Sequence, residues 1–103
     1  MPDYPILAAL IEIRSWSFED PAGWFAAIKR SGKYWPTETF GWHESDALDE
    51  LLGKPVRRIE ISTGGWSGNE EIIAAMRANL LWAITWISSR RGGHYVFEYR
   101  TSA

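Results

Sequence analysis

The chain has 103 residues, of which 11 are basic and 13 are acidic, and its formal net charge is −2. This length suits one domain, and the charge balance argues against bulk capture of duplex DNA, which needs a basic face. With 0 Cys there is neither a disulfide framework nor a thiolate metal site. We therefore expect a single cytoplasmic domain over residues 1–103, with no cofactor and no duplex nucleic acid as partner.

The first predicted element is a strand within residues 6–16. Its apolar run passes into the alternation Ile11-Glu12-Ile13-Arg14, which favours a strand, although the neighbouring alanines leave a helix open. The run is too short to span a bilayer, and no basic region precedes it as in a signal peptide. We expect no membrane partner.

A helix is predicted from Ser17 to Ser31. Asp20 is the expected N-cap, Pro21 fits the first helical position, and Gly32 ends the helix. The segment 33–42 follows as an aromatic loop, packed over the core or lining a pocket.

A short helix is predicted from Ser45 to Leu52, because Ser45 can cap it and its leucines form a stripe before Gly53. The segment 44–50 then supplies a solvated acidic helix face. Val56–Ser62 follows as a strand with apolar and charged residues on opposite faces.

The strongest helical pattern runs from about Asn69 to Ser89. Ser67 and Glu70 have the capping-box spacing at its start. Its apolar arc is roughly 200° wide, more than a helix lying on a sheet needs, so something besides the sheet must cover Trp82 and Trp86.

His94–Arg100 is predicted as the last strand, with Tyr95, Phe97 and Tyr99 on the face that meets the helix. The element order is therefore β-α-α-β-α-β. This order predicts the α+β class: a small sheet of about three strands covered by two to three helices. If the long helix connects two adjacent strands, those strands should be parallel.

The glycine loop Gly64-Gly65-Trp66-Ser67-Gly68 joins a strand to the long helix. Its backbone N–H groups could hold an anion while Trp66 stacks on the rest of the ligand. The alternative is that the glycines only permit a tight turn, since the loop matches neither the P-loop nor the dinucleotide fingerprint. Glu70 and Glu71 in the first helical turn would also repel an anion.

A second glycine-marked segment carries Arg90, Arg91 and His94. The two arginines could clamp a phosphate or carboxylate, or could merely complement the end of a helix dipole. A long helix would keep them about 30 Å from the glycine loop, too far to share one small ligand unless strands fold back or a second subunit contributes.

No arrangement of residues indicates an enzyme. His43 and His94 lack metal-ligand spacing, and no serine lies in a nucleophile-elbow context. We expect no catalytic residue and no metal site.

The chain contains 7 Trp, 4 Tyr and 4 Phe, so some rings should be available for recognition. Trp82 and Trp86 are the expected interface residues. The wide apolar arc that they share predicts a homodimer.

The segment 62–73, Leu81-Trp82, Trp86 and then Ser89–Phe97 resemble small uncharacterised proteins encoded by tailed bacteriophages and prophages. The resemblance covers residues 62–103 and implies a phage setting in the cytoplasm of a bacterial host, without a known activity. Small phage proteins are often inhibitors of host defence.

Two functional hypotheses follow. The first is a non-enzymatic binding module that holds a small anionic, nucleotide-like ligand through Gly64, Gly65, Trp66, Ser67, Arg90, Arg91 and His94. The second is a module that meets a host protein, or a small phage structural component, through an aromatic surface.

Overall fold

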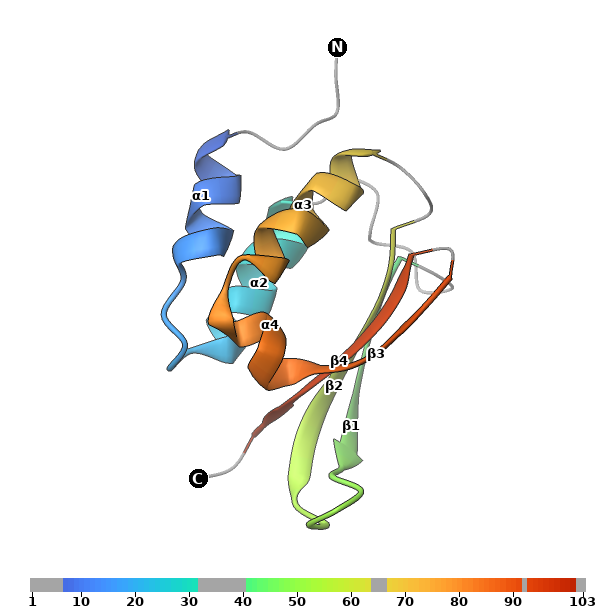
Figure 1. Cartoon of the computed structure of the whole chain (residues 1–103). Helices are drawn as coiled ribbons and strands as arrows, with labels where there is room; N and C mark the ends of the chain where they lie inside the picture. Colours follow the sequence, from blue (N-terminus) through green and yellow to red (C-terminus); the bar gives the residue numbers. More distant parts are fainter. Residues whose placement is uncertain (1–6, 32–40, 64–66, 92, 102–103) are drawn as a thin grey trace.

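The computed structural model describes residues 7–31, 41–63, 67–91 and 93–101 (Figure 1). These contain the helices α1 (Leu7–Ser15), α2 (Pro21–Ser31), α3 (Ser67–Arg77) and α4 (Leu80–Thr85), and the strands β1 (Trp42–Leu48), β2 (Pro55–Ser62), β3 (Trp86–Arg90) and β4 (His94–Arg100). The fold is α+β, as expected.

The strands form one antiparallel sheet in the order β1-β2-β4-β3. The helices lie on one face of this sheet and leave the other face open (Figure 1). The expected three strands and the β-α-α-β-α-β order are wrong, because the described part has four strands in the order α-α-β-β-α-α-β-β. The neighbours β2 and β4 are antiparallel, so the expected parallel pair is also wrong.

The core lies between the helices and the covered face of the sheet. Trp24 and Phe25 of α2 are fully or almost fully buried, as are Ile59 of β2 and Phe97 of β4. Phe97 lies 5.4 Å from Phe25 and 5.2 Å from the Trp82 ring, measured between ring centroids. The prediction that the aromatic face of the last strand meets a helix is confirmed.

The predicted cap and first residue of α2 are confirmed, but the helix begins at Pro21 and not at Ser17, and Gly32 lies outside the described residues. The Gly23 amide donates to Asp20 Oδ1 at 3.0 Å, which is the expected cap, and Pro21 is the first helical residue. The aromatic loop that follows α2 falls mostly on residues 32–40, which lie outside the described residues, and Trp42 begins β1.

Residues 7–15 form a helix, so the strand predicted within residues 6–16 is wrong. An alternation of four residues also suits a helix when only one of them must be buried. Here Ile13 is buried while Ile11 stays 48% exposed. The carbonyl oxygen of Ile13 accepts hydrogen bonds from Trp24 and Asn79, which hold α1 against the rest of the fold.

The helix predicted from Ser45 to Leu52 is replaced by the strand β1 and a hairpin turn. Its leucines form no buried stripe, since Leu51 is 93% exposed. Pairing with the neighbouring strand β2 satisfies the backbone of residues 42–48. Asp49 then organises the turn by accepting hydrogen bonds from the amides of Leu51 and Leu52.

The long helix predicted from Asn69 to Ser89 is wrong in its second half. It is interrupted at Ala78 and Asn79, resumes for six residues as α4, and continues as the strand β3. Asn79 Oδ1 accepts from the Leu81 amide at 2.8 Å, which caps a new helix. The wide apolar arc therefore belongs to three short elements that face different neighbours.

Candidate functional site

The open face of the sheet carries a row of polar side chains across three strands. Ser62 of β2 is the register partner of His94 in β4, and His94 is the partner of Arg90 in β3. The adjacent row consists of Glu60, Val96 and Ser88, in the same strand order. These residues surround a depression of about 370 Å³.

The end of β2, the start of α3 and the turn between β3 and β4 are joined by hydrogen bonds. The Thr63 amide donates to the Gly93 carbonyl at 2.9 Å, and the Thr63 hydroxyl donates to Glu70. Ser62 Oγ lies 2.5 Å from His94 Nδ1. Thr63 and Glu70, which stand on either side of the first glycine-marked segment, therefore meet the second segment's Gly93 and each other at one corner of the sheet.

Two arginines give this corner its positive charge. Arg90 and Arg91 are exposed, and neither has an ion pair within the described residues. Glu60 also lines the depression and opposes them. In the next row, Arg58 and Glu98 neutralise each other through an ion pair of 2.6 Å.

Arg90, Arg91 and His94 are thus brought together with the strand that leads into the glycine loop. The expected separation of about 30 Å is wrong, because the helix that would have imposed it ends at Arg77. Gly64, Gly65 and Trp66 lie outside the described residues. Ser67 is the first residue of α3.

The two predicted interface residues differ in their surroundings. Trp82 is half-buried, with its ring 5.6 Å from Tyr95 and the Arg77 guanidinium 5.0 Å from its centroid. Trp86 is 43% exposed at the start of β3. The additional cover that Trp82 needed comes from its own chain.

Sequence reasoning missed Ser62 and Glu60 as members of this corner. The alternation of β2 places both on its polar face, so part of the signal was available. The register that sets Ser62 beside His94 joins residues 32 positions apart, and no local pattern specifies it.

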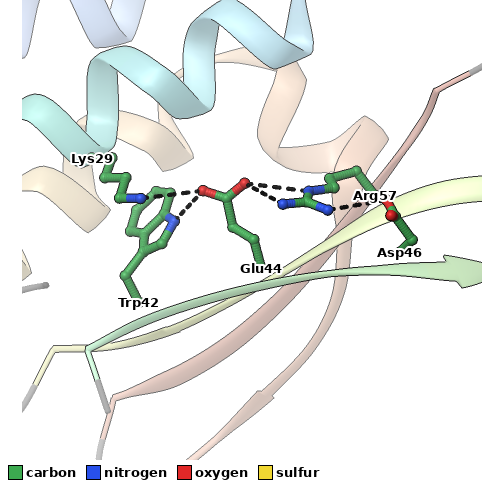
Figure 2. A network of polar contacts seen from close by, with 5 residues as sticks. All are labelled: Lys29, Trp42, Glu44, Asp46 and Arg57. Atoms are coloured by element: carbon green, nitrogen blue, oxygen red, sulfur yellow. Dashed lines mark hydrogen bonds and ion pairs between the residues drawn. The ribbon is translucent and has the colours of Figure 1, made fainter. Parts of the chain in front are cut away.

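A second polar cluster lies on the covered face of the sheet. Figure 2 shows the Glu44 carboxylate between Lys29 and Trp42 on one side and Arg57 on the other. Trp42 Nε1 donates to Glu44 at 2.7 Å, Arg57 Nη2 lies 3.2 Å from Glu44, and Lys29 Nζ lies 3.7 Å away. Arg57 also donates to Asp46 at 3.0 Å. The cluster ties α2 to the β1–β2 hairpin.

Burial acts to raise the pKa of Glu44, but hydrogen bonds from Trp42 and Arg57 and the charge of Lys29 outweigh it, so the pKa is lowered. The hydrogen bond to Asp46 is the main cause that raises the pKa of Arg57. Glu44 was expected on a solvated helix face, but it lies in a strand and both of its carboxylate oxygens form hydrogen bonds or ion pairs.

Within the described residues, no group of three His, Asp or Glu side chains is placed to hold a metal ion. None of the described helices combines the length and the apolarity needed to cross a membrane. Comparisons of the chain with protein-family models, with curated proteins and with solved structures gave no match.

Proposed function

We propose that this protein is a non-enzymatic binding module for a small anionic ligand with a phosphate or carboxylate group, and that a nucleotide is the ligand class. The observation that carries the proposal is the row formed by Ser62, His94 and Arg90 on the open face of the sheet. This row places a hydroxyl, an imidazole and a guanidinium beside one depression.

Each group has a definite part in binding. Arg90 offers the planar donor fork that suits phosphate and carboxylate oxygens, and Arg91 adds a second exposed cation. Ser62 and His94 also line the depression, and because they share one hydrogen bond, the pair offers the ligand the donor that this bond leaves over. In the phage setting that the resemblance implies, sequestering a nucleotide signal would counter host defence.

The Ser62–His94 contact does not make the site a hydrolase in this proposal. A serine nucleophile needs a base that a third group orients. Within the described part of the chain, no carboxylate is hydrogen-bonded to the His94 ring. The arrangement therefore favours binding over chemistry.

The first prediction concerns affinity. Arg90→Gln should weaken binding of the best ligand from a panel of inorganic phosphate, nucleotides and cyclic nucleotides by about tenfold or more, because a charge-assisted hydrogen bond is lost. Glu60→Gln should strengthen binding, because an opposing charge at the depression is removed. Titration calorimetry and the ligand-induced rise in melting temperature measure both effects.

Arg100→Gln is the matched control, since Arg100 is an exposed arginine at the far end of β4. It should leave affinity unchanged. The proposal is contradicted if no compound of the panel raises the melting temperature. It is also contradicted if Arg90→Gln and Arg100→Gln lose the same affinity.

A further inference from the structure

Two exposed apolar surfaces remain outside the proposed ligand site. The hairpin tip is residues 48–52, in which Leu48, Leu51 and Leu52 are 62%, 93% and 60% exposed. The α4–β3 patch consists of Leu80, Ile84, Trp86 and Ile87, which are 61%, 57%, 43% and 51% exposed. Several exposed large apolar residues close together in the chain of a small domain are typical of an interaction site.

The hairpin tip has a defined backbone conformation. Asp49 Oδ1 accepts from the amides of Leu51 and Leu52 at 2.7 and 2.9 Å, and the Gly53 amide donates to the Asp49 carbonyl at 2.8 Å. The backbone hydrogen bonds to Asp49 lower the pKa of its side chain, which keeps the carboxylate charged. The tip therefore presents its leucines with little ordering cost on binding.

In the α4–β3 patch, the Trp86 side chain is held by a hydrogen bond. The polar edge of Trp86 is satisfied, because its Nε1 donates to Ser89 Oγ at 2.7 Å. The residue is 43% exposed and can therefore make apolar contact. Leu51 of the tip and Ile87 of the patch line the same groove of one chain, beside the open face of the sheet.

The two surfaces are complementary in charge. Asp49 and Glu50 lie between the leucines of the tip, whereas Arg90 and Arg91 follow the patch after Ser88 and Ser89. Neither arginine has an ion pair within the described residues. An acidic, leucine-bearing tip thus matches an apolar patch with a basic border.

We propose that two copies of the chain form a symmetric dimer in which the hairpin tip of each copy docks on the α4–β3 patch of the other. Reciprocal contact is the form that a closed two-fold interface requires. Covering one tip and one patch would bury seven exposed large apolar residues of each copy, and a standard stable interface buries about 800 Å² per partner.

This arrangement makes a specific prediction for mixed variants. Leu51→Asp should disable the tip and Ile84→Asp the patch, so each variant alone should lose at least about a hundredfold in dimer affinity. A mixture of the two variants retains one intact tip and one intact patch. It should therefore form a heterodimer that neither variant can form with itself.

The measurement has two parts. Light scattering over a concentration series should give the wild type twice the 11.8 kDa of the chain and give each variant the monomer mass. Unlabelled Ile84→Asp added to isotope-labelled Leu51→Asp should shift the amide resonances of residues 80–87 and leave those of the tip unchanged. Adding unlabelled Leu51→Asp, in place of Ile84→Asp, to labelled Leu51→Asp should shift neither the resonances of residues 80–87 nor those of the tip.

Leu7→Asp is the control, since Leu7 is 68% exposed on α1, away from both surfaces, and this variant should dimerise like the wild type. A monomeric wild type, a dimeric Leu51→Asp variant or an absence of shifts in the mixture overturns the proposal. A tip or patch that binds only a foreign protein produces the first of these outcomes. Because Arg90 and Arg91 also border the patch, ligand affinity is measured on the monomeric Leu51→Asp variant, so either proposal can fail alone.

Discussion

At the scale of single residues, Glu44 holds two layers of the fold together. It belongs to the edge strand β1, faces the helices, and contacts Lys29 of α2 and Arg57 of β2. A carboxylate with 27% of its side-chain surface exposed is stabilised only if its oxygens are paired. Here hydrogen bonds and charges pair both oxygens.

Replacing this carboxylate should produce a pH-dependent loss of stability. The folded-state pKa of Glu44 lies below its ordinary value of 4.5. Its stabilising contribution is therefore complete above pH 4.5 and is lost as the pH falls through the folded-state pKa. Glu44→Gln should lower the free energy of unfolding by about 1–2 kcal/mol at neutral pH, with the difference from wild type shrinking in acid.

Urea denaturation at a series of pH values measures this difference. Glu71→Gln, which changes an exposed glutamate on α3, should show no such dependence. A Glu44→Gln deficit that stays constant from neutral to acidic pH would mean that packing, and not the charge, is responsible.

Alanine substitutions at Gly53 and Gly93 allow the energetic cost of a positive φ to be compared with the added cost of a steric clash. Gly53 and Gly93 both have positive φ, at 65° and 79°. A Cβ at Gly53 would meet nothing within 4 Å, whereas one at Gly93 would lie 2.1 Å from Thr63 Oγ1. Gly53→Ala should cost about 1 kcal/mol, and Gly93→Ala clearly more, because the clash adds to the strain.

Thermal or urea unfolding of the two variants checks this order. Gly93→Ala should also perturb the hydrogen bond between Thr63 and Glu70, since the added methyl group displaces the Thr63 hydroxyl. Equal costs for the two substitutions would contradict the close approach at the sheet corner.

At the scale of elements, Asn79 decides where a helix stops and another begins. Its Oδ1 caps α4, and its Nδ2 donates to the carbonyls of Ile13 and Trp16 at 2.9 and 3.0 Å. One buried side chain thus breaks the long apolar pattern and anchors the end of α1. The break allows residues 86–90 to turn back and form an edge strand.

Asn79→Ala should lower the free energy of unfolding by about 2–4 kcal/mol, because a cap is lost and buried carbonyls lose their donor. Asn79→Ser keeps a capping oxygen but lacks the reach of the amide. Its cost should therefore be intermediate. Chemical denaturation of the two variants measures the costs, and equal values would show that the cap contributes nothing.

At the scale of the whole molecule, the candidate site exists because of strand order. The β2–β4–β3 neighbourhood unites Ser62, His94 and Arg90, although the first is separated from the others by α3 and α4. The helices all lie on one face (Figure 1), and Arg90 and His94 on the other face are exposed. Leu51 of the tip and Ile87 of the patch line a groove beside that same open face.

The sequence alone determined α2, β2, β4 and the α+β class, because their signals are local. Asp20 and Pro21 mark a helix start within a few residues, and alternation in Val56–Ser62 and His94–Arg100 marks strands without knowledge of their partners. The proximity of Arg90, Arg91 and His94 was also predictable, since these residues are close together in the sequence.

Only the tertiary structure decided the identity of α1, β1 and β3 and the geometry of the site. Leu48, Leu51 and Leu52 have helical spacing, yet pairing of β1 with β2 satisfies more backbone groups than a short exposed helix could. Trp86–Arg90 continues a helical pattern, yet it forms a strand because β4 offers it a partner. Pairing and burial depend on residues distant in the sequence, and local patterns do not encode them.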